Sequence, residues 1–482
     1  MAPVDRSLLV RLEEKARLLT PGPEERAGWL RLVDGHTAAW LEALDDLPAR
    51  VPDGEVPRAA LAALPIRNDP RPLPEVLAAL RLGVDTIGLN ESSGSFFGFI
   101  PGSGNYAAAL ADYAAAVVNR YAGVYYAAPG AVRLGRACLE WLAAVVGYPA
   151  DCGGDITSGG SIATLSAVVA AREARGLRAA DFDGCVVYLT AQTHHAVDKA
   201  IRIAGLGGAE RRLVPLDGRY RMRPDALARL IDDDRAAGRR PFLVVASAGT
   251  TDTGAVDPLA AVADVCAARD VWLHVDAAYG GAFALTGRGR ELLAGLERAD
   301  SMVIDPHKGF FLPFGTGVVL VRERSDLVRA FSATAGYMED ALAVEPAGAL
   351  SPAELSPELT RPFRALRWWL SLQLGGVEAH RAALEEKLLL ARHAHERLAA
   401  RDGFIVGPEP DLTIFTFRIA GGDAANRALV DAIRDDGRIY LSATTLDGRY
   451  TPRFAVLNVG SHLAEVDRAV DVIAELAAGL RP

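Results

Sequence analysis

From about residue 155 onward, short apolar runs alternate with segments of helical periodicity, and this rhythm constrains the fold more than any other feature. The apolar runs read CVVYLT, RRLVPL, FLVVASA, VWLHVD, SMVID and GVVLVR. They lie between stretches such as SIATLSAVVAAREAR, DALARLIDDD and PLAAVADVCAARD, whose apolar residues recur at helical spacing. Strands that are apolar throughout and alternate with helices are typical of a mainly parallel sheet covered on both faces. The sequence therefore predicts a large α/β domain whose ligands bind at the carboxyl ends of the strands.

Two flanking regions depart from this pattern. The N-terminal region contains charged amphipathic stretches, such as RSLLVRLEEKARLL and HTAAWLEALDDL, joined by proline-rich connectors and without a strand pattern. We expect a helical segment that needs another surface, such as a second subunit, to cover its apolar stripe. Near the end of the chain, DLTIFTFRI and RYTPRFAVLNV are alternating runs typical of a small antiparallel sheet. The predicted organisation is a helical segment over residues 1–90, a large domain over 91–375 and a small C-terminal α+β domain over 376–482.

Charge and composition exclude several classes of protein. The 52 Lys+Arg against 61 Asp+Glu give a net charge of −9 without a basic run, which argues against nucleic acid as the main partner. Charged residues interrupt the apolar stretches before the ~18 residues that a membrane span needs. The start, MAPVDRSLLVRLEEK, is charged too early for a secretory signal, and the four cysteines have neither disulfide nor zinc spacing. We therefore expect a cytoplasmic protein with no nucleic-acid partner, no membrane attachment and no metal.

Charged residues fall at the carboxyl ends of two predicted strands. The run VWLHVD ends in Asp276, SMVID ends in Asp305, and Lys308 follows shortly after. A carboxylate and an amine in an apolar setting are unfavourable unless they are paired or used in chemistry. A structural ion pair between Asp276 and Lys308 is therefore weighed against a catalytic pair. A further run, FLVVASA, leads into 249–251 (Gly-Thr-Thr) at the same predicted edge.

A loop of small residues precedes a long helical stretch in the large domain. Ser158-Gly159-Gly160-Ser161 runs directly into IATLSAVVAAREAR. Backbone N–H groups at a helix start, with hydroxyl groups beside them, suit a phosphate, although an ordinary Gly-Ser helix cap fits the pattern equally well. The loop matches neither the Walker pattern nor the dinucleotide fingerprint, which argues against a nicotinamide enzyme.

A pair of histidines follows the run CVVYLT. His194 and His195 are adjacent, so their side chains should lie on opposite sides of the element. A lone histidine is more often structural than catalytic, and a metal site built with Asp276 and His307 lacks the usual HxxxH or HxH spacing. Taken together, a phosphate-holding helix start, a flat side chain, a carboxylate and a lysine are what pyridoxal 5′-phosphate requires.

Four motifs in a fixed order carry a family resemblance. They are THHAVDKA, HVDAAYGG, DPHKGFFLPFGTG and ELTRPFRALRWW. From about Phe96 to its C-terminus, the chain resembles the group II pyridoxal-phosphate decarboxylases of the aminotransferase fold-type I, of which the aromatic-L-amino-acid decarboxylases are the best-known members. The resemblance implies a homodimer with active sites at the subunit interface, a pyridoxal 5′-phosphate cofactor, and decarboxylation of an L-amino acid through a quinonoid intermediate.

The resemblance also implies roles for individual residues. Lys308 is expected to form the Schiff base with the cofactor and later to transfer a proton, Asp276 to pair with the ring nitrogen, and His194 to stack on the ring. Ala278 is expected against the opposite ring face, and Arg364 matches a family arginine to which we assign no role. The implied cofactor-binding residues are Ser158, Gly159, Gly160, Ser161, His194, Thr250, Asp276, Ala278, Asp305, His307 and Lys308. The implied substrate-pocket residues, some of them reaching across the dimer interface, are Phe99, Ile100, Pro101, Tyr125 and Tyr126.

One segment departs from the family pattern. In the aromatic decarboxylases, a loop before the RFR-type segment carries a tyrosine that protonates the carbanion, whereas the corresponding stretch here is Ser351-Pro352-Ala353. Tyr337 lies earlier in the chain and is a poor substitute. Loss of that tyrosine is associated in the family with oxygen-dependent aldehyde formation.

Three hypotheses therefore stay open. The first is an amine-forming decarboxylase, for which the aromatic side chains of the implied substrate pocket favour an aromatic or apolar amino acid, although ordinary core packing explains those side chains equally well. The second is a pyridoxal-phosphate enzyme that diverts the carbanion, as an oxygen-dependent aldehyde synthase, a Cα–Cβ lyase or another biosynthetic enzyme. The third is a non-catalytic relative, which retention of the Lys308 and Asp276 pair disfavours.

Overall fold

The computed structural model describes residues 4–333 and 350–480 of the chain. The chain divides into two compact units, residues 1–93 and residues 94–482. Across the described ranges, no helix combines the length and the apolar character that a membrane crossing needs.

The first unit is mainly helical, as predicted. Its helices are α1 (Arg6–Ala16), α2 (Pro23–Ala43), α3 (Glu55–Ala62) and α4 (Leu73–Leu80), followed by a π-helical turn, η2 (Arg81–Asp85). No residue of α1, α2 or α3 is buried, and many of their large apolar side chains are exposed in a single chain. The expectation of no strand in this region was wrong in one detail, because β1 (Arg50–Val51) and β2 (Gly88–Leu89) form a short antiparallel pair.

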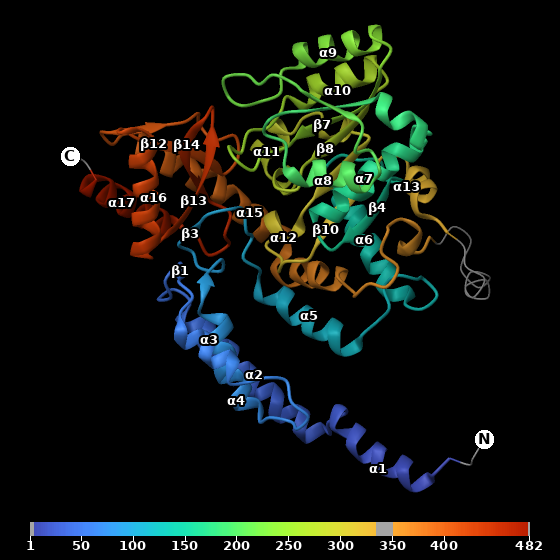
Figure 1. Cartoon of the computed structure of the whole chain (residues 1–482), viewed down its shortest axis with the longest axis vertical. Helices are drawn as coiled ribbons and strands as arrows, with labels where there is room; N and C mark the ends of the chain where they lie inside the picture. The colour runs from blue at the N-terminus through green and yellow to red at the C-terminus, as the bar shows by residue number, and fades with distance from the viewer. Residues whose placement is uncertain (1–3, 334–349, 481–482) are drawn as a thin grey trace. The chain divides into compact units, whose positions relative to one another are not determined.

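A seven-stranded sheet forms the centre of the second unit (Figure 1). Its strands, in spatial order, are β4 (Gly153–Thr157), β10 (Gly317–Val321), β9 (Ser301–Ile304), β8 (Trp272–Asp276), β7 (Arg240–Ser247), β5 (Cys185–Leu189) and β6 (Glu210–Leu213). The pairings from β9 through β8, β7 and β5 to β6 are parallel, while β10 is antiparallel to both of its neighbours. The predicted strands and the mainly parallel arrangement are confirmed. Strand β4 is not evident from the sequence, because GGDIT has too few apolar residues to form a run.

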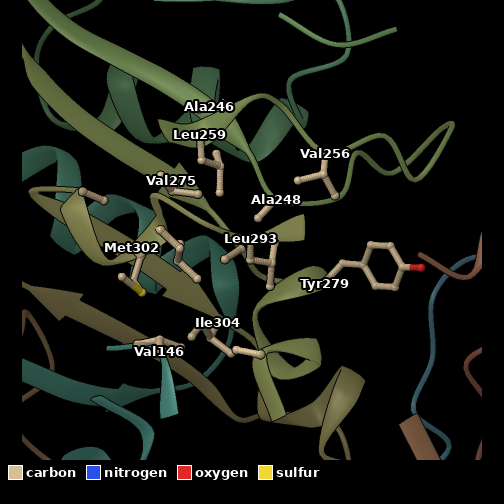
Figure 2. Packing of buried hydrophobic residues seen from close by; sticks show 14 of the residues in the cluster. Val146, Ala246, Ala248, Val256, Leu259, Val275, Tyr279, Leu293, Met302 and Ile304 are labelled. Atoms are coloured by element: carbon tan, nitrogen blue, oxygen red, sulfur yellow. The ribbon is translucent and has the colours of Figure 1, made fainter. Parts of the chain in front are cut away.

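Helices cover both faces of this sheet. Helices α6 (Pro129–Val145), α9 (Pro224–Ala236) and α10 (Leu259–Ala268) pack on one face, and α7 (Gly160–Ala174), α8 (His195–Ile203) and α13 (Arg324–Phe331) pack on the other. The same part of the chain also contains α5 (Tyr106–Val118), α11 (Gly287–Leu292) and α12 (Pro306–Gly309). In strand β7, Val244 and Ala246 belong to a hydrophobic cluster with residues of α6, α9 and α10, part of which is shown in Figure 2. The intervening Leu243 and Val245 belong to a second cluster with residues of α7, α8 and α13. Burial on both faces explains why the strands read as continuous apolar runs.

A second, five-stranded sheet forms near the end of the chain (Figure 1). Its strands, in spatial order, are β11 (Phe404–Val406), β12 (Ile414–Ile419), β14 (Arg449–Ala455), β13 (Tyr440–Leu446) and β3 (Phe96–Phe97), and its helices are α16 (Gly422–Asp436) and α17 (Leu463–Gly479). Strands β12 and β14 contain the two predicted antiparallel runs, and they pair with each other. Strand β3 pairs in parallel with β13. Residues 96–97 therefore join this sheet, although the predicted boundaries assign them to the large domain.

The long helix α15 (Ala365–Ala399) links the two parts of the second unit. It is interrupted at Gly376, whose φ of +74° and ψ of 156° are not helical. A left-handed φ is accessible to glycine without the steric cost that a Cβ brings. The break falls next to the predicted boundary between residues 375 and 376.

Candidate active site

A cavity of about 310 Å³ lies at the carboxyl edge of the large sheet. Its walls come from the segments that follow β4, β5, β7, β8 and β9, whose ends meet at one edge. Every residue that the sequence suggests for cofactor binding lines this cavity. These residues are Ser158, Gly159, Gly160, Ser161, His194, Thr250, Asp276, Ala278, Asp305, His307 and Lys308. The lining residues that the sequence did not assign to cofactor binding are Ile162, Thr164, Gln192, Ala196, Ser247, Gly249, Thr251 and Tyr279, of which Gly249 and Thr251 were already expected at this edge.

Lys308 lies in the short helix α12, soon after strand β9. Its Nζ is 3.0 Å from Asp305 Oδ2. Burial, the largest influence, acts to lower the pKa of Lys308, but the charges of Asp305 and Asp276 and the hydrogen bond to Asp305 together raise that pKa above its ordinary value. The amine is therefore protonated at neutral pH in this structure. The ion pair of Lys308 is made with Asp305, so the simple structural pair between Asp276 and Lys308 is not the arrangement found.

Asp276 is the last residue of β8 and presents its carboxylate to the cavity. Its Oδ1 accepts a hydrogen bond from the Ala278 amide at 3.1 Å. This contact fixes the carboxylate and leaves Oδ2 as an acceptor for a group inside the cavity. Ala278 lines the same cavity, and its side chain is small enough to leave room for a flat ring.

His194 is the residue that precedes helix α8 and caps it. Its Nδ1 accepts from the Ala196 amide at 3.3 Å, which places the imidazole proton on Nε2. Burial is the main influence on the pKa of His194 and lowers it below the ordinary value, so the ring is neutral at pH 7. The ring of His195 lies 4.1 Å away, centroid to centroid, but His195 is exposed and does not line the cavity.

The start of helix α7 forms another wall of the cavity. The amides of Ile162 and Ala163 both donate to the Gly159 carbonyl, whereas those of Gly160 and Ser161 precede the first intrahelical hydrogen bond. Two free N–H groups at a helix start make a site for an anion, and the helix dipole adds to the attraction. Gly159 has a φ of +152°, which side-chain-bearing residues rarely adopt, and so requires glycine.

These residues fit the four requirements of pyridoxal 5′-phosphate. The α7 start provides phosphate donors, Asp276 an anion, Lys308 an amine and His194 a flat partner. Two polar atoms of the lining, Gln192 Oε1 and one carboxylate oxygen of Asp305, are buried and lack hydrogen-bond partners within the described ranges. Such atoms suit a site built to take further polar groups. Residues 4–333 and 350–480 contain no group of three or more side chains suited to a metal ion.

The wall that contains Thr250 and Thr251 is held in place from the second sheet. Thr250 Oγ1 lies 2.8 Å from Thr253 Oγ1, within the loop after β7. The buried Arg453 of β14 donates to the Asp252 carbonyl at 3.0 Å and also to the Thr251 carbonyl. One guanidinium group therefore fixes the backbone of this wall, and no local pattern in the sequence indicates such a contact.

Tyr279 and Gly249 form a second contact that the sequence did not suggest. Gly249 has a φ of +101°, and a Cβ there would lie 2.7 Å from Tyr279 Cδ1. The Tyr279 ring projects away from the other labelled side chains of the core cluster in Figure 2, and its hydroxyl lies 2.6 Å from Thr413 Oγ1. Tyr279 belongs to the motif HVDAAYGG and follows the end of β8 by three residues. That position could have indicated from the sequence that Tyr279 lies at the cavity.

The residues suggested for a substrate pocket do not line the cavity. Ile100 is buried, and the neighbouring Gly102 packs directly against the Lys308 backbone. Phe99 is half-exposed, with its ring 6.1 Å from that of Tyr440. Pro101 is buried and Tyr126 is exposed. Tyr125 is buried, and its hydroxyl lies 2.7 Å from Arg133 Nη2. A role for these five residues toward substrate stays a prediction.

The segment that lacks the family tyrosine is ordered around Pro352. It forms a short 3₁₀ turn, η7 (Pro352–Glu354), and the Tyr125 amide donates to Ser351 Oγ at 2.9 Å. Tyr337 lies outside the described residues. Arg364 precedes α15 and pairs with Glu358 at 2.6 Å, so it is engaged in a structural contact away from the cavity.

Known proteins resemble this chain over most of its length. Residues 59–420 match the model of the pyridoxal-dependent decarboxylase conserved domain. The aromatic-L-amino-acid decarboxylase of Bacillus atrophaeus is 36% identical over 372 residues, which cover 75% of this chain and 77% of that protein. The aromatic-L-amino-acid decarboxylase of Bos taurus is 33% identical over 403 residues, with 80% and 82% coverage. Among solved structures, Oryza sativa TDC with PLP and tryptamine matches with a TM-score of 0.90 and 26% identity, covering 96% of this chain and 99% of its own.

Proposed function

Because the chain belongs to the pyridoxal-dependent decarboxylase family, we propose that it removes the α-carboxyl group of an aromatic or apolar L-amino acid and releases the amine. It is a pyridoxal-phosphate-dependent carboxy-lyase. Two relatives are named as aromatic-L-amino-acid decarboxylases, and this supports the substrate class by analogy. The observation that carries the proposal is the meeting of Lys308, Asp276 and His194 at one cavity beside the start of α7.

The cofactor end of the reaction depends on Asp276. When bound, pyridoxal 5′-phosphate supplies an aldehyde that reacts with amines and a protonated ring that accepts the electron pair of the broken carbon–carbon bond. Asp276 would hold that ring proton, and its Oδ2 is the oxygen that is not engaged with the Ala278 amide. A nearby negative charge favours the protonated form of a ring nitrogen, which strengthens the pull on electrons.

Lys308 and His194 handle protons on the substrate side. The Lys308 amine would have to lose a proton before it could attack an aldehyde, and that loss would end its 3.0 Å ion pair with Asp305. The neutral His194 ring would provide a flat surface for the cofactor ring, and its Nε2 carries the proton because Nδ1 accepts from the Ala196 amide. Both residues line the cavity, and either could return a proton to the substrate after the carboxyl group has left.

The test uses the full chain purified with pyridoxal 5′-phosphate and a panel of amino acids. We expect a yellow protein whose cofactor absorbance is lost in Lys308→Ala. Aromatic or apolar L-amino acids should give carbon dioxide and amine in equal amounts, and dicarboxylic amino acids should react more slowly. A colourless protein that ignores the cofactor, or a panel that yields no carbon dioxide, would overturn the assignment.

One observation favours a second reaction on the same cofactor: the segment around Pro352 lacks the tyrosine that the family has there. Without a proton donor at that place, the carbanion left by decarboxylation has longer to react with oxygen or another acceptor. The alternative enzyme is an oxygen-dependent aldehyde synthase, a Cα–Cβ lyase or another carbanion-diverting enzyme. Oxygen uptake with peroxide and aldehyde formation would favour it, whereas stoichiometric amine without oxygen uptake would exclude the oxidative version.

The proposed assembly is a homodimer. Helices α1, α2 and α3 bury no residue in a single chain, and they expose apolar side chains such as Leu8, Leu12 and Trp29. Exposed apolar side chains on neighbouring helical turns, as at Leu8 and Leu12, are typical of subunit interfaces. Light scattering is expected to give twice the chain mass, and the double variant Leu8→Glu/Leu12→Glu should shift the protein toward monomer. A wild-type protein at the monomer mass would contradict this assembly.

The proposed location is the cytoplasm. Cys138, Cys152, Cys185 and Cys266 are free thiols, and three of them are buried. Unpaired buried thiols are typical of a reducing compartment. Cell fractionation should recover the protein with the cytoplasmic fraction, and recovery from an oxidising compartment would contradict the proposal.

A further inference from the structure

Asp305 stands at the residue before helix α12 but does not cap it. No hydrogen bond joins its side chain to the amides of α12, which a capping aspartate normally engages. The side chain is instead 4% exposed and lines the cavity. Its Oδ2 lies 3.0 Å from Lys308 Nζ and 3.7 Å from His307 Nε2. This position needs an explanation other than helix capping.

The other carboxylate oxygen, Oδ1, is buried and has no hydrogen-bond partner among the described residues. Buried polar atoms in native proteins are bonded in the large majority of cases, so a lone buried acceptor calls for a reason. An acceptor that lines a binding cavity is free to receive a donor from the bound molecule. Asp305 Oδ1 is such an acceptor.

The same carboxylate lies against the first residue of α7. A Cβ placed on Gly160 would lie 2.7 Å from Asp305 Oδ2 and 2.9 Å from Oδ1, so only glycine leaves room for the carboxylate there. Gly160 and Ser161 supply the amides proposed to hold the cofactor phosphate. A carboxylate and a phosphate therefore converge on one helix start. Two full negative charges on the phosphate would be repelled by Asp305, whereas a singly protonated phosphate carries an O–H donor for Oδ1.

We infer that Asp305 makes this protein take up its cofactor with the phosphate singly protonated, with the phosphate hydroxyl donating to Asp305 Oδ1. This inference rests on the proposed seating of the phosphate at the start of α7. The proton arrives with the singly protonated phosphate or comes from solvent to form the phosphate O–H bond, and no bond between heavier atoms changes. The affinity for a phosphorylated ligand then falls as pH rises, because the second pKa of a phosphate ester is about 6.

The charged groups around Asp305 do not supply this pH dependence. Lys308 and His307 lie on α12, His194 precedes α8, and Asp276 ends β8. Burial is the main cause that lowers the pKa of both His194 and His307, so both rings are neutral above pH 7. The pKa of Lys308 is raised overall, although burial opposes this, so the amine keeps its proton through pH 8. Between pH 7 and 8 the phosphate is then the group that changes charge.

The test measures the affinity of the cofactor-stripped full chain for pyridoxine 5′-phosphate, which has the phosphate but no aldehyde to react with Lys308. For the wild-type protein, we expect affinity to fall about fivefold from pH 6 to 7 and about tenfold from pH 7 to 8, following the singly protonated fraction. Asp305→Asn should bind with affinity that changes less than about twofold over this range, and more tightly than wild type at pH 8, because an amide NH₂ can donate to the doubly charged phosphate. Asp326→Asn, a matched buried carboxylate paired with Arg329 and absent from the cavity lining, should keep the wild-type slope. Unphosphorylated pyridoxine should bind all three proteins equally at each pH.

Three results would overturn the inference. The first is a wild-type affinity that does not change between pH 6 and 8, and the second is an Asp305→Asn slope equal to that of wild type. The third is a ³¹P resonance of the loaded wild-type protein at pH 8 typical of a doubly charged phosphate, a measurement that needs no variant. If pyridoxine 5′-phosphate binds none of the proteins at any pH while pyridoxal 5′-phosphate still gives amine, the phosphate seating is overturned and the decarboxylase assignment stands.

Discussion

The large sheet and the N-terminal unit bury their apolar side chains in opposite ways. Residues 243–246 of β7 are completely enclosed between helices of the same chain. Helices α1, α2 and α3 bury nothing, although α1 carries leucines on its surface. A single chain thus buries the apolar side chains of the sheet completely. The N-terminal unit needs a second surface to bury its own apolar side chains. The candidate site is lined only by residues of the part that forms its own core, so changes there and changes in the N-terminal unit should have separate effects.

The largest effect is expected at the edge of the sheet. Lys308→Ala should lower decarboxylation by at least about 10³-fold, because it removes the amine that we propose holds the cofactor and transfers protons. The thermal midpoint of the cofactor-free protein should stay within a few degrees, since the core strands are untouched. Steady-state kinetics and calorimetry would measure the two quantities. Lys199→Ala, an exposed lysine of α8, is the control, and full activity in Lys308→Ala would disprove the role.

The next effect compares the two regions directly. Leu243→Ala in β7 should lower the free energy of unfolding by roughly 3 kcal/mol, because it removes a fully buried side chain and leaves a cavity. Leu12→Ala in α1, where the leucine is 54% exposed, should change it by less than about 0.5 kcal/mol under monomeric conditions. Denaturant titration at low protein concentration measures both. Equal losses of unfolding free energy in the two variants would show that Leu12 is already packed in a core within a single chain.

The third prediction concerns how the buried His274 of β8 makes the free energy of unfolding depend on pH. Burial lowers the pKa of His274 in β8 to about 4, whereas an unfolded histidine titrates near ~6.5. Between these values the unfolded chain binds a proton that the folded chain does not, so acidification destabilises the fold, by up to roughly 3 kcal/mol. In His274→Gln the plot of unfolding free energy against pH should be flatter by about 1.4 kcal/mol per unit between pH 6 and 4.5. An unchanged slope would show that His274 titrates normally.

The smallest effect is expected at the tip of the N-terminal unit. Asp5 accepts from the Ser7 amide at 2.9 Å and so caps α1. Asp5→Ala should speed hydrogen exchange at the amides of Ser7 and Leu8, while the global unfolding midpoint stays unchanged. Exchange measured by mass spectrometry or NMR separates the local change from the global one. A clear drop in the global midpoint would mean that α1 is coupled to the core after all.

Much of the large sheet was predictable, because strands buried on both faces keep continuous apolar runs. Strand β4 was not, since its glycines leave no such run, and only its neighbours in space make it a strand. Strand β3 was assigned by sequence position to the large domain, but its partner β13 lies more than 300 residues away, and no local pattern encodes a two-residue parallel pairing.

The candidate site was predictable for a different reason. Parallel strands end at a common edge, so polar residues that directly follow apolar runs were expected to meet, and Asp276, Lys308 and His194 do line one cavity. Contacts that depend on the whole fold gave no such signal. The carboxylate of Asp305 beside Gly160, and the hold of Arg453 on the loop after β7, arise from segments far apart in the sequence.

The link from Arg453 has a practical meaning for protein engineering. A chimaera that exchanges the β13–β14 hairpin for that of a relative would also exchange the clamp on the carbonyls of Thr251 and Asp252. The loop and the hairpin therefore form one design module despite their separation in sequence. Transplanting them together should preserve cofactor loading. Transplanting the hairpin alone should make the loop after β7 more mobile, although no proposed catalytic residue is changed.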